Sequence, residues 1–216
     1  MVAELPNGIQ CVVFDVGETL VDESRYWTDL ALRAGVTPVT LSAVLGSLIE
    51  RGESHTRLWD ALEVSRPQTP ASIGTTDLYE DALDCVAAAR GAGFTVGIAG
   101  NQPADVEALL RDAAFDADFI ASSAAWGVAK PARGFFDRVI AAAQVAPPSI
   151  LYVGDRVDND VLPARAAGMR TAFVRRGPWG HIHARRPEAA LADLRVDSLD
   201  ELARIFIGDR SQGSPM

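Results

Sequence analysis

The stretch ILYVGDRVDND, residues 150–160, decides the fold of this chain. Its first four residues are all apolar instead of alternating with polar ones, which is typical of a parallel β-strand that is covered on both faces. Gly154 and Asp155 end this run, and residues 158–168 then follow a helical pattern that stops at Gly168. A buried strand followed at once by a helix is the repeating unit of an α/β protein.

The same unit recurs along the chain. Four further apolar runs lie at residues 11–14, 94–99, 119–121 and 171–174. Helical patterns separate or follow them at residues 79–90, 103–113, 135–145 and 197–207. Because strands that alternate with helices build βαβ units, we expect an α/β fold with a Rossmann-like parallel sheet flanked by helices.

One segment interrupts this alternation. Residues 24–76 contain helical stretches and no convincing strand. We therefore interpret residues 23–76 as a small helical cap domain, inserted between the two parts of the α/β core at residues 1–22 and 77–210. Residues 211–216 are mostly polar and include glycine and serine, so we expect a disordered tail there.

The composition excludes several classes of protein. The 216 residues are 48% hydrophobic and 23% charged, as in folded globular proteins. The net charge of −9 argues against a nucleic-acid partner, because a phosphate backbone repels an acidic surface. No apolar run reaches the roughly 18 residues of a membrane span, and no signal peptide is visible. The chain has only two cysteines and so no disulfide framework, which is typical of a cytoplasmic protein. We also expect a monomer or homodimer without a membrane partner.

Polar residues that follow the apolar runs mark the candidate site. In an open parallel sheet, ligands bind at the carboxyl ends of the strands. Asp15 follows the first run and Asn101 the second. Lys130 lies on the connection after the third run, and Asp155 and Asp160 follow the fourth. Acidic side chains and one base therefore converge from four strands, which a random scatter of surface residues does not produce.

Lys130 is also unusual in the composition of the chain. Lysine and arginine together number 20, and Lys130 is the only lysine, so the other 19 are arginine. A compositional bias explains the arginines, but it does not explain why position 130 kept a lysine. Because a compact ammonium reaches a single point that a planar guanidinium cannot, we interpret Lys130 as a site residue.

Four segments carry a resemblance to a known family. They are VVFDVGETL at 12–20, VGIAGN at 96–101, SAAWGVAKP at 123–131 and YVGDRVDNDVLPARAAGM at 152–169. Together they resemble the motifs of the haloacid dehalogenase (HAD) superfamily of hydrolases, in the form that has a helical cap inserted after the first motif. The resemblance implies a Mg²⁺-dependent phosphoryl hydrolase that acts on a small phosphorylated metabolite.

The resemblance also implies roles for individual residues. Asp15 would attack phosphorus and form an aspartyl phosphate, and Lys130 would neutralise both this nucleophile and the transferring phosphoryl group. The carboxylates of Asp15 and Asp155 and the backbone carbonyl of Gly17 would hold the Mg²⁺ cofactor. Asp160 would hold the water shell of the metal or the loop beside it.

The substrate-binding positions of the family fall on Thr19, Gly100 and Asn101. Two positions, Gly17 and Gly100, depart from the pattern of the family. Phosphatases of the family usually have a second Asp at position 17, which protonates the leaving group and then activates water, but here the residue is Gly17. Such general acid–base help is worth roughly 10²–10⁴-fold in rate. Gly100 replaces a Ser or Thr whose hydroxyl binds a phosphate oxygen, and Asn101 substitutes for it only in part.

Three explanations of Gly17 are open at this point. The leaving group of the substrate departs without protonation, as in an acyl phosphate or a phosphoanhydride. Alternatively, another residue supplies the proton, and Glu18, His55 and His181 are the candidates. In the third explanation, the protein is a catalytically degraded relative that binds a phosphorylated ligand without turnover.

A 2-haloacid dehalogenase is a further enzymatic alternative. A departing halide needs no proton, so a dehalogenase would tolerate Gly17. The dehalogenase branch of the family does not use the metal, however, whereas Gly154 and Asp155 resemble the metal-binding form.

Other aromatic and histidine residues receive structural interpretations. Trp27 and Trp59 are expected in the core of the cap or in its seam with the α/β core. Residues 175–179 are expected to form a surface loop after the last strand. His181 and His183 are two positions apart, but no further histidine or cysteine lies nearby to complete a metal site.

Overall fold

The core of the protein is a six-stranded parallel sheet. The computed structural model describes residues 4–68 and 73–212, with side chains as far as residue 208. The strands follow the order β3-β2-β1-β4-β5-β6, and every neighbouring pair is parallel. Their bounds are β1 (Cys11–Phe14), β2 (Thr95–Gly100), β3 (Phe119–Ser122), β4 (Ile150–Gly154), β5 (Arg170–Val174) and β6 (Leu194–Val196). The expected Rossmann-like α/β fold is therefore confirmed.

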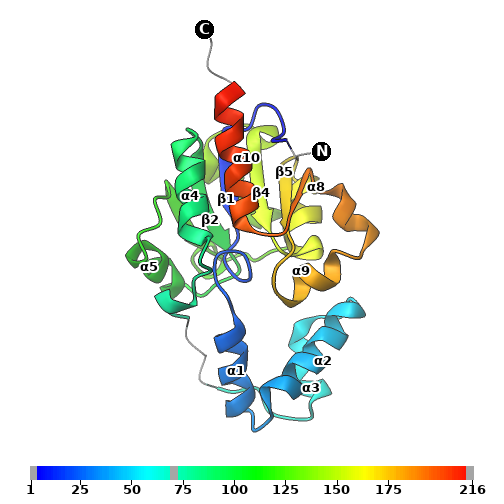
Figure 1. The fold of residues 1–216 in the computed structure, drawn as a ribbon. Helices are drawn as coiled ribbons and strands as arrows, with labels where there is room; N and C mark the ends of the chain where they lie inside the picture. The colour runs from blue at the N-terminus through cyan, green and yellow to red at the C-terminus, as the bar shows by residue number, and fades with distance from the viewer. Residues whose placement is uncertain (1–3, 69–72, 213–216) are drawn as a thin grey trace.

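Helices cover both faces of the sheet (Figure 1). One face carries α4 (Ala82–Gly91), α5 (Asp105–Asp112) and α10 (Leu199–Gln212), and the other carries α6 (Ser123–Trp126), α7 (Arg133–Ala143) and α8 (Leu162–Ala166). In β1, Val12 and Phe14 pack into the first layer, while Cys11 and Val13 pack into the second. This two-sided burial is the reason why the strand is apolar at every position.

Strand β6 was not expected from the sequence. It has three residues and lies at the edge of the sheet, where Leu194 and Val196 are buried and Arg195 between them is exposed. A short edge strand with one buried face leaves no apolar run in the sequence.

Short turns of 3₁₀ and π helix complete the connections. The π-helical turn η4 (Val157–Val161) joins β4 to α8. The 3₁₀ turns are η1 (His55–Arg57), η2 (Thr75–Asp77), η3 (Pro147–Ser149) and η5 (Pro187–Leu191). Single π turns occur often at functional sites, and η4 follows the strand whose end carries Asp155.

The segment between β1 and α4 forms a separate group of helices below the strands in Figure 1. It contains α1 (Ser24–Arg33), α2 (Pro38–Glu50) and α3 (Leu58–Ala61). Thr37 caps α2 by accepting the backbone N–H of Thr40, and Pro38 suits its first turn. Leucine side chains of α2 and α3 form the small hydrophobic core of this group, which we call the cap.

Residues 175–179 do not form the surface loop expected from the sequence. They lead into helix α9 (Gly177–His183), in which Pro178 occupies the first turn. Trp179 is only 6% exposed and packs into the hydrophobic core of the cap. The sequence does not reveal this burial, because the apolar partners of Trp179 come from a distant part of the chain.

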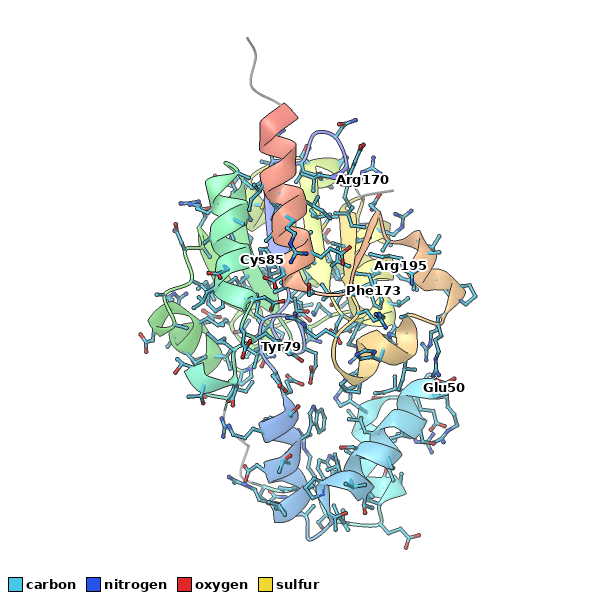
Figure 2. All side chains as sticks on the ribbon, viewed as in Figure 1. Glu50, Tyr79, Cys85, Arg170, Phe173 and Arg195 are labelled. Atoms are coloured by element: carbon cyan, nitrogen blue, oxygen red, sulfur yellow. The ribbon has the colours of Figure 1, made fainter. Side chains whose placement is uncertain are left out.

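Polar contacts also join α9 and the residues after it to the cap. Figure 2 shows Glu50 at the end of α2 that faces the α/β core. Its carboxylate accepts a hydrogen bond from Arg185 at 2.6 Å, and Arg186 donates to the backbone carbonyl of Ile49. The contact between cap and core is therefore made of both an apolar and a polar part.

Helix α10 is longer than the sequence predicts. It continues through Gly208 to Gln212, instead of ending near residue 207. One glycine costs a helix only about 1 kcal/mol, and α10 packs along α4. Residues 211 and 212 are therefore helical, and the rest of the expected tail, 213–216, lies outside the described residues.

Within residues 4–68 and 73–212, no single helix has both the length and the apolar character needed to cross a membrane. The bent pair α1 and α2, which meet at 111°, passes this test by length and composition only when the two are taken together.

Candidate functional site

The candidate site lies at the carboxyl ends of β1 and β4. Strands β2 and β3 extend the sheet on one side of β1, and β4, β5 and β6 extend it on the other. Such a reversal of strand order opens a crevice that binds ligands. Asp15 directly follows β1, and its backbone N–H donates to the carbonyl of Val153 at 2.8 Å. Asp155 directly follows β4, and both aspartates are almost fully buried.

Lys130 lies between two of the carboxylates. Its Nζ atom is 2.6 Å from Asp15 Oδ1 and 2.6 Å from Asp160 Oδ1, and its side chain is 1% exposed. Burial alone would lower the pKa of Lys130, but these carboxylates reverse the direction and raise it well above its usual value. The only lysine of the chain is therefore a buried and permanently positive charge beside Asp15.

Asn101 holds the loop that carries Lys130. Its Oδ1 accepts the backbone N–H of Lys130 at 2.7 Å, and its Nδ2 donates to the backbone carbonyl of the same residue at 2.9 Å. The side chain also lines the cavity described below. The structure thus brings Asn101 to the site as a support for Lys130, and its contact with substrate stays a prediction.

Asp160 is held at both of its carboxylate oxygens. Oδ1 accepts the hydrogen bond from Lys130, and Oδ2 accepts the backbone N–H of Arg156 at 2.9 Å. A Cβ at Gly154 would collide with this carboxylate, so glycine is needed where Asp160 crosses the end of β4. Burial raises the pKa of Asp160 to about 6, although Lys130 acts in the opposite direction.

Asp155 has a buried oxygen that lacks a partner. Among the described residues, nothing forms a hydrogen bond with its Oδ2. Burial, followed by the charges of Asp160 and Asp15, raises the pKa of Asp155 well above its usual value. One carboxylate oxygen from each of the three aspartates lies within 4.8 Å of the others. An unpaired buried carboxylate is costly, so this arrangement fits a bound divalent cation, which prefers oxygen ligands.

The three aspartates are not equivalent as ligands for such a cation. Both oxygens of Asp160 already accept hydrogen bonds, and Oδ1 of Asp15 faces Lys130. Asp155 and the second oxygen of Asp15 are therefore the better ligands. Gly17, whose carbonyl was expected to bind the metal, lines the same cavity.

A cavity of about 420 Å³ lies between these residues and the cap. Asp15 and Lys130 line it from the α/β core, and Trp27 and Trp59 line it from the cap. The two tryptophans also pack against the core of the cap, to which Trp179 belongs. The volume is typical of a site for a small molecule.

Two of the expected substrate-binding residues are not among those that line this cavity. Thr19 is fully buried, and its hydroxyl has no hydrogen-bond partner among the described residues. A Cβ at Gly100 would stand 2.6 Å from Asp15 Oδ1. The space into which a side chain at position 100 would extend is thus occupied by the carboxylate of Asp15.

The residues considered as alternative proton donors differ in position. Glu18 lines the cavity, but its Oε2 accepts a hydrogen bond of 2.6 Å from the hydroxyl of Tyr79, and its carboxyl packs onto Gly177. His55 also lines the cavity, from the cap. His181 is exposed and is not part of the lining.

His183, two positions after the exposed His181, is only 1% exposed. Its Nδ1 accepts the backbone N–H of Val157 at 3.1 Å, at the start of the π-helical turn. Because burial lowers the pKa of His183 to about 4, the side chain is neutral and acts as a structural acceptor.

Glu23, the residue that precedes α1, also belongs to the site, although the sequence does not predict it. Its carboxyl lies partly buried in the cavity, directly over Gly17. The indole N–H of Trp27 donates to its Oε2 at 3.3 Å. Burial, followed by the charges of Glu18 and Asp15, raises the pKa of Glu23 to about 7. The spacing of four residues between Glu23 and Trp27 was the available signal, but it does not reveal where the carboxyl points.

Comparison with known proteins gives a consistent picture. Residues 127–202 match the model of a family described as HAD-hydrolase-like. The chain is 26% identical to the glyceraldehyde 3-phosphate phosphatase of Methanopyrus kandleri, over 90% of this chain and 95% of that protein. It is also 34% identical to the phosphoserine phosphatase of Thermus thermophilus, over 58% of this chain and 49% of that protein.

The lengths of the matches and the structural likeness add two facts. The chain spans only between 34% and 49% of the length of four of the curated relatives that it matches. Its fold is similar to that of the L-2-haloacid dehalogenase from Xanthobacter autotrophicus with chloropropionic acid covalently bound, with a TM-score of 0.68. The sequence identity to that protein is 21%, over 93% of this chain and 99% of the other.

Proposed function

Because the chain belongs to the haloacid dehalogenase superfamily of hydrolases, we propose that it is a Mg²⁺-dependent phosphatase that works through an aspartyl phosphate. The observation that carries the proposal is the contact of Lys130 with Asp15, beside the unpaired buried oxygen of Asp155. Folding alone gains little from such a cluster of buried carboxylates, because like charges in a low-dielectric site repel each other.

The residues would divide the work as follows. Asp15 Oδ1, which lies beside Lys130, would attack phosphorus and form the covalent intermediate, so that Oδ2 stays available to the metal. Lys130 would then compensate negative charge on both the nucleophile and the phosphoryl group from one fixed point. Asp160 would hold Lys130 and the backbone of Arg156 in place.

Mg²⁺ is the cation that we propose for the oxygen cluster. Asp155, the second oxygen of Asp15 and the carbonyl of Gly17 would hold it, and bound Mg²⁺ would supply positive charge to the phosphoryl oxygens. Asp160 would act next to this set through its hydrogen bonds, rather than as a direct ligand.

The substrate that we propose is a small phosphorylated metabolite. The cavity of about 420 Å³ has room for a compact molecule beside Asp15. Its far wall contains the tryptophans of the cap and Arg66, which suits a short carbon chain with a polar or anionic end. Phosphate esters of three-carbon metabolites are the first class to test, because the relatives named above act on two of them.

Phosphate release tests the proposal. Wild-type protein is expected to release phosphate from acetyl phosphate or p-nitrophenyl phosphate when Mg²⁺ is present and to stop when EDTA is added. Asp15→Asn is expected to abolish the reaction. Release that persists in Asp15→Asn comes from a contaminant or another residue, and it would overturn the assignment of the nucleophile.

Dehalogenation is the second candidate function. It is favoured by the likeness in fold to an L-2-haloacid dehalogenase and by Gly17, because a halide leaves without a proton. Halide release from 2-chloropropionate in the presence of EDTA would support it. The unpaired oxygen of Asp155 argues for the metal-dependent reaction instead.

A ligand-binding protein without turnover is the third candidate. In that case a phosphorylated metabolite binds, as detected by calorimetry, while no phosphoenzyme forms. The buried pair of Asp15 and Lys130 would then have no catalytic use.

A further inference from the structure

The residue at position 17 lacks a side chain, yet the space beside it is filled. A Cβ at Gly17 would collide with Oε1 of Glu23 and would stand 2.9 Å from its carboxyl carbon. Gln102 Nε2 would be 3.4 Å from the same Cβ. The carboxyl of Glu23 therefore occupies the volume into which a side chain at position 17 would extend.

We propose that Glu23 is the proton-transfer residue of this enzyme and replaces the missing aspartate at position 17. This inference rests on the proposed phosphatase function. It is carried by the position of the carboxyl: Glu23 lines the same cavity as Asp15, from the first residue of the cap segment. The atoms nearest to the Cβ position of Gly17 belong to the carboxyl of Glu23.

The surroundings of Glu23 fix its carboxyl in this place. The indole N–H of Trp27 donates to Oε2, and the side-chain amide of Gln102 also forms a hydrogen bond with the carboxyl. Trp27 lies one helical turn after Glu23 on α1, so the helix itself aligns donor and acceptor. Two hydrogen-bond donors fix the orientation of this carboxyl, and a proton-transfer group must have a fixed orientation toward its substrate.

The other candidates lack this placement. The carboxyl of Glu18 is turned onto Gly177 and accepts the hydroxyl of Tyr79. The ring of His55 packs edge-on against Trp179, with 5.9 Å between the ring centroids. Neither side chain fills the space over Gly17.

The proposed reaction has two steps that balance. In the first, Asp15 attacks phosphorus, the bond from phosphorus to the ester oxygen breaks, and this oxygen takes the proton of the Glu23 carboxyl and leaves as an alcohol. In the second, the Glu23 carboxylate takes a proton from water as the water oxygen attacks the aspartyl phosphate. The bond from phosphorus to Asp15 breaks, inorganic phosphate leaves, and Asp15 carboxylate and protonated Glu23 are restored.

The dependence of the rate on the leaving group distinguishes a proton-transfer role of Glu23 from a purely structural role. Glu23→Gln keeps the shape and the acceptor oxygen but cannot carry the proton. Formation of the phosphoenzyme, trapped by acid quench, is expected to be unchanged within about threefold when acetyl phosphate is the donor. From phenyl or alkyl phosphates it is expected to fall by roughly 10²–10⁴-fold, because only these leaving groups need protonation. The trapped phosphoenzyme is also expected to persist, because its hydrolysis loses the base.

Moving the carboxyl from position 23 to position 17 tests whether the two side chains occupy the same space. Gly17→Asp alone is expected to give no gain with phenyl phosphate, because its side chain collides with Glu23. The double variant Gly17→Asp/Glu23→Ala is expected to be at least about tenfold faster than Glu23→Ala, as the returned aspartate takes over the proton. Glu18→Gln, which changes another carboxyl that lines the cavity, is the matched control and is expected to keep the leaving-group dependence of the wild type.

The outcomes distinguish this inference from the proposed function. Equal slowing of phosphoenzyme formation from acetyl phosphate and from phenyl phosphate in Glu23→Gln would overturn the proton-transfer role, and so would no change with either donor. The proposed function fails separately, if wild-type protein forms no Mg²⁺-dependent phosphoenzyme or if Asp15→Asn still forms it.

Discussion

The side chain of Asn101 forms hydrogen bonds with both backbone groups of Lys130. One side-chain amide accepts the N–H of Lys130 at 2.7 Å and donates to its carbonyl at 2.9 Å. The loop that carries the only lysine is thus fixed to the end of β2, and the ammonium is placed by the backbone as well as by its own carboxylate partners.

Loss of these two hydrogen bonds is expected to reduce turnover. Asn101→Ala removes two hydrogen bonds, each worth about 1 kcal/mol, so the free energy of unfolding is expected to fall by roughly 1–3 kcal/mol. A displacement of Lys130 by about 1 Å would lower kcat by up to roughly 10²-fold. Steady-state kinetics and urea unfolding measure the two effects. Asn101→Asp keeps the acceptor for the N–H of Lys130 and should lose less of both. Equal kcat in all three proteins would contradict this role for Asn101.

Both the positive charge and the compact shape of the Lys130 side chain are expected to be required. Lys130→Met leaves two buried carboxylates without their cation, which is expected to cost roughly 3–5 kcal/mol of stability in the metal-free protein. Lys130→Arg keeps the charge but has no space for a guanidinium between Asp15 and Asp160, so phosphoenzyme formation should fall by roughly 10²-fold or more. Denaturant unfolding and acid-quench trapping test these values.

A compensating variant is the control for Lys130. Lys130→Met/Asp15→Asn removes one of the unpaired charges and is expected to regain part of the lost stability. A double variant no more stable than Lys130→Met would show that the cost has another origin.

Mg²⁺ is expected to stabilise the protein through Asp155. Its carboxylate oxygen has no hydrogen-bond partner among the described residues, so removal of the charge by Asp155→Asn should stabilise the metal-free protein, by roughly 1 kcal/mol or more. Added Mg²⁺ should raise the Tm of the wild type and leave that of Asp155→Asn unchanged. An equal rise of Tm in both proteins would place the ion elsewhere.

The pH dependence of this metal effect follows from the raised pKa of Asp155. The folded protein holds the proton of Asp155 more tightly than the unfolded chain does. The contribution of this group to stability is therefore complete below its ordinary pKa near 4 and is lost as the pH rises through the folded value. The Tm increase caused by Mg²⁺ should accordingly grow from pH 5 to pH 8, as thermal unfolding at several pH values will measure.

His183 is expected to destabilise the fold at acid pH. Its folded pKa of about 4 lies below the ordinary value near 6.5, so the neutral form is favoured by folding. This contribution is complete above about pH 6.5 and is lost as the pH falls towards 4, by up to roughly 3 kcal/mol. Urea unfolding between pH 4 and pH 7 measures it. His183→Gln keeps an acceptor for the N–H of Val157 and should flatten the curve in that window, and an unchanged slope would refute this assignment.

The sequence was sufficient to predict the framework of the site. Asp15 and Asp155 directly follow buried strands, and Lys130 and Asp160 lie on the connections after two strands. Because the strands of a parallel sheet end on one edge, the strand pattern predicts that these residues converge. The structure places all four within one cluster. The apolar runs predicted five of the six strands for the same reason.

Features that depend on distant residues could not be predicted in this way. The space beside Gly17 exists only in three dimensions, and no local pattern shows that Glu23 fills it. From the sequence, Gly100 indicates the loss of a phosphate-binding hydroxyl, whereas in the structure its lack of a side chain leaves room for Asp15. The sequence predicts a loop where helix α9 begins, because Trp179 is buried by the cap instead of by its own neighbours.

The burial of Trp179 restricts how this enzyme can admit and release molecules. The indole belongs to the α/β core through α9, yet it completes the apolar interior of the cap. If the cap moved straight away from the sheet, this ring would enter water, at a cost of roughly 1.5–3 kcal/mol or more for so large a side chain. A rotation that keeps the ring in place costs less. Any opening of the cavity is thus expected to keep Trp179 within the cap.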